Sequence, residues 1–247
     1  MASNIGVILQ ARMTSTRLAA KVLMKICNKP VIYHVIERLK YCKKIDDVIL
    51  AIPDTSENDA LAEYAMKIGC HYARGSEHDV LSRYLQAAKK FDVTDIIRVT
   101  ADCPLIDPVL VDFMVEYYLT KNVDYVAIDV DKYFPRGLDA EIFSYATLQK
   151  VDKEAKQNYE REHVTPYIYG HPELFEIKFL EAEKKLTRPE IRLTVDTQED
   201  FNLVKCIFDN LYDKDKMFYA ADVIDFLDSH PELLVINKDI TQKKLGE

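Results

Sequence analysis

Short apolar runs alternate with helix-like patterns along the first half of the chain. Four apolar runs are too short for buried helices and are typical of buried strands: 4–10, 48–52, 95–100 and 125–128. Apolar residues recur at helical spacing in the stretches between or after them: 31–43, 59–68, 79–91 and 108–119. This alternation predicts βαβ units, and therefore an α/β fold with a mostly parallel sheet.

Helix boundaries can also be read from the polar residues. Pro30 precedes the first helix at a position where proline is tolerated, and Asp107 is placed to cap the helix that begins at Pro108. Gly69 suits the position just after a helix end. These residues favour the same element boundaries as the apolar pattern.

The second half of the chain is less regular. Residues 129–145 do not follow the alternating pattern of strands and helices. After them, the periodicity predicts helices over 145–156, 159–169, 199–212 and 220–227, and strands over 175–180 and 191–195. Because no internal repeat or linker is visible, we interpret residues 1–247 as one domain with an inserted region at 129–180.

Composition narrows the class of protein. The 247 residues are 48% hydrophobic and 30% charged, which is ordinary for a globular protein. No apolar run approaches the roughly 20 residues that cross a bilayer, and the N-terminus does not look like a secretory signal. A net charge of -8 argues against general nucleic-acid binding. The five cysteines are scattered and odd in number, as expected of reduced thiols in a cytoplasmic protein.

Charge is unevenly placed along the chain. The first 36 residues hold five Lys and Arg and no acid, whereas the remaining 211 carry a net charge of -13. A basic segment on an acidic protein suggests a local anion site. In parallel sheets ligands bind in the loops after the carboxyl ends of strands. The loops 11–21 and 101–107 are therefore the first candidates for a binding site.

The loop 11–21 combines three cations with three hydroxyls. The cations are Arg12, Arg17 and Lys21. Guanidinium groups, hydroxyls and backbone amides are the groups that bind a triphosphate. The spacing matches no P-loop or dinucleotide-binding fingerprint, because the chain has six glycines, none in such a pattern. A flexible polar connection is the alternative interpretation.

Two carboxylates follow predicted strands. Asp102 comes two residues after the run DIIRVT (95–100), and Asp196 directly follows the predicted strand 191–195. Together they could hold Mg²⁺ with phosphate oxygens. Two alternatives stay open: Asp102 could cap a turn, and Asp196 or Thr197 could cap the next helix.

These segments resemble the cytidylyltransferases that make CMP-activated sugars, in the branch of spore coat polysaccharide biosynthesis protein F. The loop 11–21 is similar to that family's Ala-Arg-x-x-Ser-x-Arg-Leu-Pro-Gly-Lys motif, with Ala19-Ala20 in place of Pro-Gly. Glycine at the second position would let the backbone approach phosphate without a Cβ. Similar motifs follow in the family's order at 74–81, 100–107, 135–139, 161–167 and 194–197.

The resemblance implies a three-layer αβα fold of the nucleotide-diphospho-sugar transferase type, which is Rossmann-like, with an inserted acceptor and dimer region. It implies an enzyme that transfers CMP from CTP to a sugar acid or phosphorylated sugar or polyol, releasing pyrophosphate, for surface polysaccharide or glycan synthesis. The expected cofactor is Mg²⁺, and the expected assembly is a homodimer.

The resemblance also assigns roles to residues of this chain. The expected catalytic residues are Lys21, Arg12 and Asp102, and the expected metal ligands are Asp102 and Asp196. The expected nucleotide-binding residues are Leu9, Gln10, Ala11, Arg12, Ser15, Thr16, Arg17, Lys21, Pro53, Asp54, Arg74, Gly75, Ser76, Asp79, Thr100 and Ala101. The expected acceptor-binding residues are Arg136, Asp139, Glu141, Arg161 and His163. For His163 and Arg161 a purely structural role is the alternative.

Two other functions remain open from the sequence. Asp129-Val130-Asp131 follows a predicted strand and fits the Asp-x-Asp pattern of metal-dependent glycosyltransferases, although this pattern leaves the loop 11–21 unexplained. A non-catalytic nucleotide-binding module is the second, supported by Ala19-Ala20.

Overall fold

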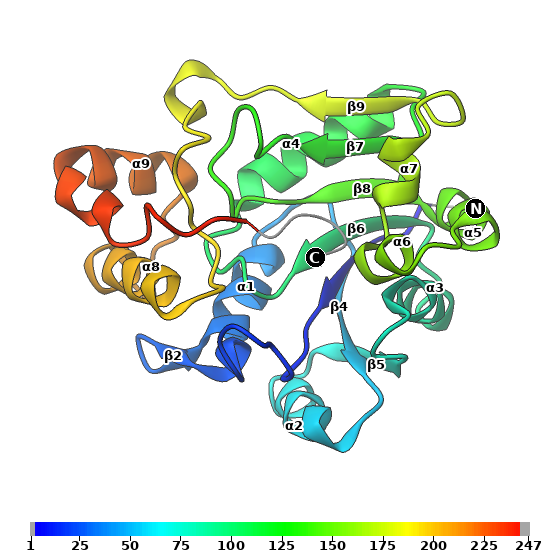
Figure 1. The fold of residues 1–247 in the computed structure, drawn as a ribbon, viewed down its shortest axis with the longest axis horizontal. Helices are drawn as coiled ribbons and strands as arrows, with labels where there is room; N and C mark the ends of the chain where they lie inside the picture. The colour runs from blue at the N-terminus through cyan, green and yellow to red at the C-terminus, as the bar shows by residue number, and fades with distance from the viewer. Residues whose placement is uncertain (1–2, 243–247) are drawn as a thin grey trace.

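The computed structural model describes residues 3–242 and has an α/β architecture (Figure 1). Within these residues the main sheet has seven strands in the order β5-β4-β1-β6-β8-β7-β9. They are β1 (Ile5–Gln10), β4 (Asp47–Pro53), β5 (His71–Gly75), β6 (Asp95–Thr100), β7 (Tyr125–Ile128), β8 (Glu141–Ser144) and β9 (Ile177–Leu180). Strand β8 is antiparallel to its neighbours β6 and β7, and the other pairings described in this sheet are parallel. The predicted mostly parallel sheet is confirmed.

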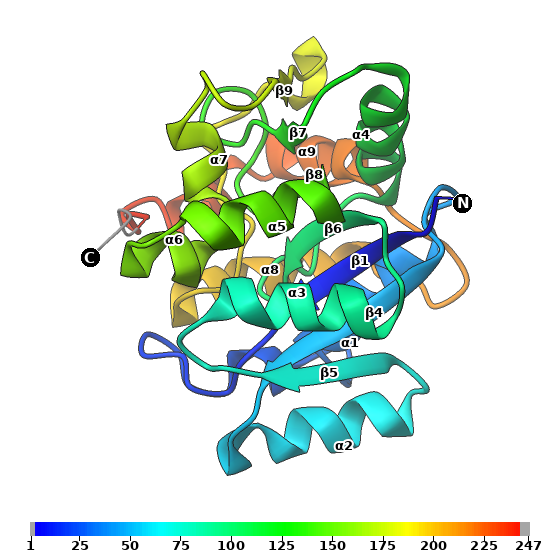
Figure 2. The same cartoon turned by 90° about the vertical axis from the view of Figure 1, so that its right-hand side faces the viewer.

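Helices cover both faces of the sheet and make three layers (Figures 1 and 2). One face shares a core with α1 (Val31–Lys40), α2 (Asp59–Lys67) and α4 (Pro108–Thr120). The other face shares a core with α3 (Val80–Lys90), α5 (Tyr145–Glu154) and α7 (Pro166–Gly170), and α6 (Asn158–His163) packs against α3. A third core joins α8 (Gln198–Leu211) and α9 (Ala220–Ser229) to the extended segment 191–195.

The remaining short elements lie in connections. They are the hairpin strands β2 (Lys25–Ile26) and β3 (Lys29–Pro30), and the 3₁₀ turns η1 (Lys21–Leu23), η2 (Ser56–Asn58), η3 (Lys184–Leu186) and η4 (Pro231–Val235). Among residues 3–242 no helix is long and apolar enough to cross a membrane.

Most predicted elements are confirmed to within a few residues, and the predicted caps are present. The Asp107 carboxylate accepts hydrogen bonds from the backbone N–H of Val109 at 2.8 Å and of Ala220 at 2.6 Å. The same side chain therefore caps α4 and ties α9 to it. Gly69 follows α2 with a φ of 64°, which is the left-handed conformation expected just after a helix end.

Several predictions are wrong for identifiable reasons. The predicted helix 159–169 is broken into α6 and α7, because Val164 has a φ of 73°, and α7 begins at Pro166, where proline is tolerated as the first residue of a helix. The segment 191–195 is extended but forms one bridge, Arg136 to Arg192, and joins no sheet within the described residues.

Strands β5 and β8 lack a long apolar run and were not predicted. Residues 129–180 supply β8 and β9 to the main sheet, so they continue its core.

Gly137 allows the chain to pass close to the segment 191–195. Its φ is 105°, and an added Cβ would lie 2.6 Å from the backbone carbon of Leu193. We expect Gly137→Ala to lower the free energy of unfolding by roughly 2 kcal/mol or more, measured by urea denaturation. Gly170→Ala is the matched control, because an added Cβ there meets nothing within 4 Å. Equal stability of the two variants would contradict this account of the turn.

Candidate active site

The carboxyl ends of β1 and β6 lie side by side and open into a cleft. Gln10 and Thr100 are paired in register, so the loops that follow them leave the sheet at the same edge. The cleft has a volume of about 550 Å³. Its described lining residues are Gln10, Ala11, Arg12, Ser15, Thr16, Arg17, Lys21, Val22, Val80, Arg83, Arg98, Thr100, Ala101, Asp102, Cys103, Arg136, Asp139, Asn158, Tyr159, Glu162, His163, Thr194, Asp196 and Gln242.

Lys21 lies between two carboxylates in this cleft. Its Nζ is 2.8 Å from Oδ2 of Asp102 and 2.7 Å from Oδ1 of Asp196. The two aspartates therefore share one pocket, as the sequence predicted. Asp196, however, follows the extended segment and not a strand of the sheet, so the expected strand-end position is wrong. The backbone N–H of Val195 donates to the carbonyl of Asp102 at 2.7 Å and fixes the two segments side by side.

Asp196 is held by two further cations. Nη2 of Arg17 lies 2.9 Å from Oδ1 of Asp196, and Nη2 of Arg192 lies 2.7 Å from Oδ2. Nε of Arg192 is in turn 3.0 Å from Oδ1 of the fully buried Asp200. Arg192, which does not line the cleft, thus holds Oδ2 of Asp196, while Oδ1 contacts Lys21 and Arg17, which do line it. The helix cap is Thr197, whose hydroxyl accepts from the backbone N–H of Asp200.

The charges of Lys21 and Asp102 stabilise each other. Burial alone would lower the pKa of Lys21, but the carboxylates of Asp102 and Asp196 outweigh it and hold this pKa above its usual value. Burial alone would raise the pKa of Asp102, but the Lys21 ammonium and the Thr100 hydroxyl bond hold it below its usual value. The groups are therefore charged at neutral pH.

The two carboxylates are suited to a divalent cation. Their convergence on one ammonium shows that a single ion can reach one oxygen of each. Within residues 3–242 no cluster of three or more His, Cys, Asp or Glu side chains could hold a metal. Since Mg²⁺ is commonly bound by one or two carboxylates together with substrate phosphates, two protein ligands fit an ion that arrives with a nucleotide.

The loop 11–21 is fixed by contacts to its surroundings. The backbone N–H of Met13 donates to Oδ1 of Asn58 at 2.9 Å, and the Thr14 hydroxyl donates to Glu77 at 2.5 Å. Ala20 has a φ of 54°, a left-handed conformation that costs a non-glycine residue about 1 kcal/mol. Because of these contacts, we reject the alternative interpretation of the loop 11–21 as a flexible polar connection.

The structure brings together many of the predicted site residues. Those that line the cleft are Gln10, Ala11, Arg12, Ser15, Thr16, Arg17, Lys21, Thr100, Ala101, Asp102, Arg136, Asp139, His163 and Asp196. Burial and the guanidinium groups of Arg98 and Arg12 lower the pKa of His163, despite Glu162, so its ring is neutral near pH 7. Burial raises the pKa of Asp139, although Arg136 lies 3.7 Å away.

Other predicted nucleotide-binding residues lie outside the lining of the cleft. Arg74 pairs with Asp54 at 3.3 Å and with Asp59 at 2.7 Å, and its Nη2 donates to the carbonyl of Thr55 at 2.7 Å. Leu9 is fully buried in the core. The residues of this group that do not line the cleft are Leu9, Pro53, Asp54, Arg74, Gly75, Ser76 and Asp79.

Two predicted acceptor-binding residues are engaged elsewhere. Arg161 pairs with Asp79 at 2.7 Å and with Asp152 at 2.8 Å, joining α6 to α3 and α5. Glu141 accepts from Arg98 at 2.8 Å and from the Tyr125 hydroxyl at 2.9 Å. Neither lines the cleft. These partners favour the structural role for Arg161.

Asp129 and Asp131 do not form a pair of open metal ligands. Oδ1 of Asp129 accepts from the backbone N–H groups of Asp131 at 3.2 Å and Lys132 at 3.0 Å, which makes it a turn cap. Asp131 pairs with Arg136. Neither aspartate lines the cleft. The Asp-x-Asp metal site that the glycosyltransferase interpretation requires is therefore not formed by these residues.

The sequence reasoning missed several lining residues. Arg98 lines the cleft, and Arg192 does not line it but pairs with Asp196. Both are charged residues inside apolar stretches of the sequence, and this signal could have identified them. Arg83, Asn158, Tyr159 and Glu162 project from α3 and α6, and their place in the cleft depends on how these helices pack.

A fixed cationic loop facing two carboxylates at the edge of a three-layer sheet suits a nucleoside triphosphate and the transfer of its nucleotidyl group. This defines the class of the protein as a nucleotidyltransferase. The profile of the cytidylyltransferase family matches residues 6–235, and the chain belongs to this family of CTP-utilising enzymes.

Individual relatives are similar over almost the whole chain. An uncharacterized protein of Methanocaldococcus jannaschii is 42% identical over 246 residues, covering 98% of both chains. The spore coat polysaccharide biosynthesis protein SpsF of Bacillus subtilis is 32% identical over 235 residues, covering 93% of this chain and 96% of that protein. The structure of a cytidylyltransferase from Leptospira borgpetersenii superimposes with a TM-score of 0.89 at 32% identity, covering 98% and 100% of the two chains.

Proposed function

We propose that this enzyme transfers CMP from CTP to an anionic sugar or polyol and releases pyrophosphate. An acceptor oxygen attacks the α-phosphorus, the bond from that phosphorus to the bridging oxygen breaks, and pyrophosphate leaves with the electron pair. The observation that carries the proposal is the meeting of Lys21, Asp102 and Asp196 beside the loop 11–21. In such reactions a protein contributes mainly by positioning and by neutralising charge.

The residues of the loop would bind the triphosphate. Arg12 and Arg17 present guanidinium groups to the cleft, and the hydroxyls of Ser15 and Thr16 line it beside them. Lys21 would move its ammonium from the carboxylates to a phosphate oxygen. Arg17 pairs with Asp196 and can make the same exchange.

Asp102 and Asp196 would hold Mg²⁺, which neutralises phosphate charge when it is bound. Arg192 keeps the Asp196 side chain in place, since it binds the carboxylate oxygen that Lys21 does not contact. Thr100 does the same for Asp102, because its hydroxyl donates to Oδ1 at 2.5 Å. Each aspartate would thus offer one oxygen in a fixed direction.

The acceptor would lie beyond the triphosphate, near Arg136, Asp139 and His163, which line the cleft. The name of the Bacillus subtilis relative supports a role in surface polysaccharide or glycan synthesis. The five cysteines are free thiols, in keeping with work in the cytoplasm.

A screen of pyrophosphate release tests the proposal. Four nucleoside triphosphates are each combined with Mg²⁺ and a panel of sugar acids, sugar phosphates and polyol phosphates. We expect release with CTP and at least one anionic acceptor, at a rate at least tenfold above that of the other three nucleotides. Release with a nucleotide other than CTP, or with none, would contradict the proposal.

We also infer a homodimer, as the resemblance implies. Leu148, Val151 and Ile168 of the helices over 145–169 are buried within the chain and would not contribute to its interface. The exposed hydrophobic residues of this region are Tyr159, Tyr169, Leu174 and Phe179, and they support the inference.

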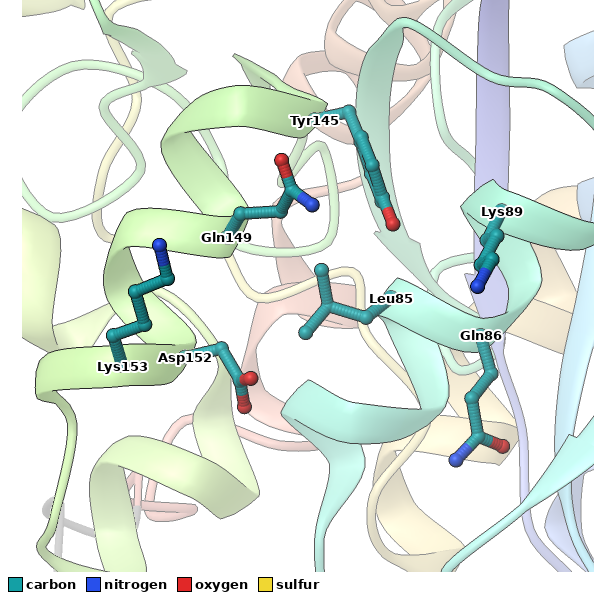
Figure 3. Close-up of a pocket in the computed structure, with 7 residues that line it drawn as sticks. All are labelled: Leu85, Gln86, Lys89, Tyr145, Gln149, Asp152 and Lys153. Carbon is teal, nitrogen blue, oxygen red and sulfur yellow. The ribbon is translucent and has the colours of Figure 1, made fainter.

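A hollow of about 250 Å³ also lies on this side of the molecule, between α3 and α5. Figure 3 shows Tyr145 and Gln149 of α5 facing Leu85 of α3 across it. The hollow shares no lining residue with the cleft. Because long side chains such as Lys89 and Lys153 line it, we assign it no ligand.

The dimer is tested at Phe179, which is 49% exposed on the edge strand β9. We expect wild type to sediment as a dimer at micromolar concentration and Phe179→Asp to raise the dimer dissociation constant at least tenfold. Met66→Asp is the matched control, because Met66 is 59% exposed on α2. Monomeric wild type, or equal weakening by both changes, would contradict the inferred interface.

A further inference from the structure

The chain returns to the cleft after its last helix. Residues 236–242 follow η4 and run from the side of α8 and α9 toward the middle of the molecule (Figure 1). The last described residue, Gln242, lines the cleft. The segment lies beyond residues 6–235, which match the family profile. Asn237 is 6% exposed, whereas its neighbours in the segment are partly or fully exposed. A buried polar side chain in such a segment needs hydrogen-bond partners.

The side chain of Asn237 holds Arg192 at two places. Nδ2 of Asn237 donates to the backbone carbonyl of Arg192 at 3.0 Å and to Oδ1 of Asp200 at 2.8 Å. The same Oδ1 accepts from Nε of Arg192 at 3.0 Å. Asn237 therefore fixes the backbone of Arg192 directly and its guanidinium through Asp200. The same segment also supplies Gln242, whose Oε1 accepts from Nη1 of Arg192 at 2.8 Å.

Both residues that Asn237 contacts hold Asp196 in turn. Nη2 of Arg192 lies 2.7 Å from Oδ2 of Asp196. Oδ2 of Asp200 accepts from the backbone N–H of Asp196 at 3.1 Å. Arg192, Asp196 and Asp200 are 8%, 6% and 0% exposed, so a bond lost among them leaves a buried polar group unpaired. A shift of Arg192 or Asp200 would therefore move both the side chain and the backbone of Asp196.

The direction of the Asp196 carboxylate matters because it would hold the metal. Arg192 binds Oδ2, and Oδ1 contacts Lys21 in the cleft, so Oδ1 is the oxygen available to the ion. Groups that hydrogen-bond to metal ligands orient them, and losing one such group typically lowers metal affinity by roughly 10- to 100-fold. The bonds of Asn237 stabilise two groups of this kind, Arg192 and Asp200.

We propose that Asn237 is a positioning residue for Asp196, and that the segment 236–242 belongs to the active site. This inference rests on the proposed function, because it takes Asp196 as a metal ligand. Asn237 does not line the cleft and acts through Arg192 and Asp200. Its loss lets both groups shift, weakens metal binding and leaves the loop 11–21 in place. A residue that only anchored the segment 236–242 would change stability and leave metal affinity unchanged.

The test measures Mn²⁺ binding by electron paramagnetic resonance. The protein is saturated with α,β-methylene-CTP, which cannot be cleaved between the α- and β-phosphates. We expect Asn237→Ala to weaken Mn²⁺ about tenfold, at the lower end of the range because Asn237 acts through other residues. The affinity for the analogue without metal should stay within a factor of about three of wild type, because the contacts of the loop 11–21 are retained.

Ile224→Val is the matched control. Ile224 is 1% exposed in the core that α8 and α9 share, and its apolar side chain makes no hydrogen bond. The substitution lowers stability by removing a buried methylene, and it should leave Mn²⁺ affinity unchanged. If Asn237→Ala does not fold, Asn237→Ser carries the test. The serine hydroxyl has one proton and keeps at most one of the two bonds, so Mn²⁺ affinity should fall roughly threefold or more.

Two results would overturn the inference: Asn237 variants that bind Mn²⁺ as wild type does, or an equal loss of Mn²⁺ affinity in Ile224→Val. The second result would show that lowered stability alone weakens the metal. Wild type that binds no Mn²⁺ in the presence of the analogue is a different outcome. It would contradict the proposed function, and the inference with it, before any variant is compared.

Discussion

Replacing Lys21 with alanine will lower kcat about 10²-fold or more, while the affinity for CTP changes much less. As the triphosphate breaks, negative charge grows on the leaving pyrophosphate oxygens. A compact ammonium stabilises that charge more in the transition state than in the ground state. The expected loss is that of one preorganised electrostatic contact. Arg12 and Arg17 remain in the variant and continue to bind phosphate.

Steady-state pyrophosphate release measures this effect, with CTP affinity determined separately by calorimetry. Lys25→Ala is the matched control, because Lys25 carries the same charge four residues away and is exposed. Its kcat should stay within a factor of two of wild type. A Lys21→Ala enzyme with unchanged kcat would remove Lys21 from the mechanism and weaken the assignment of the loop 11–21 as a phosphate site.

Asp102→Asn will also lower kcat about 10²-fold or more, and it will weaken metal binding. The amide cannot replace a carboxylate as a charged ligand, and it no longer attracts the Lys21 ammonium. The fold should survive, because Asp196 still pairs with Lys21 at 2.7 Å. We expect the melting temperature to fall by about 4 °C or less, which corresponds to a loss of about 1 kcal/mol.

Binding of Mn²⁺ in the presence of α,β-methylene-CTP, followed by electron paramagnetic resonance, gives a readout that does not depend on turnover. Asp112→Asn is the control, since Asp112 accepts hydrogen bonds from the backbone amides of Lys43 and Lys44 and does not line the cleft. If Asp102→Asn binds Mn²⁺ and turns over as wild type does, Asp102 is not a metal ligand.

The fold was largely predictable from the sequence because β1 and β4 at the centre of the sheet are nearly continuous apolar runs. Both strands are buried along almost their whole length, and the apolar residues of the flanking helices recur at 3.6-residue spacing. β5 and β8 were missed because a short strand that is polar or lies at an edge does not show this signal. The break between α6 and α7 depends on the conformation of Val164, which local composition does not reveal.

The site was accessible where it lies on loops directly after strands. Lys21, Asp102 and Asp196 were predicted and meet in one cleft. Lys21 and Asp102 lie on the loops after β1 and β6, whose carboxyl ends share an edge of the sheet, whereas Asp196 is held beside them by the hydrogen bond from Val195 to Asp102. Residues on helices were not predictable in the same way. Arg83 and Arg161 look alike in sequence, yet Arg161 has two carboxylate partners and Arg83 has none within 4.0 Å among the described residues. That difference arises from packing between helices.

The most direct test of the central claim follows the fate of the α-phosphate. The protein is incubated with Mg²⁺, the panel of acidic sugars and polyol phosphates, and CTP labelled with ³²P at either the α- or the γ-position. The account predicts that the α-label enters a new product with an acceptor, that the γ-label appears in pyrophosphate in equal amount, and that Lys21→Ala slows both about 10²-fold. Acceptors that remain unlabelled throughout, or a γ-label that enters the acceptor, would contradict it.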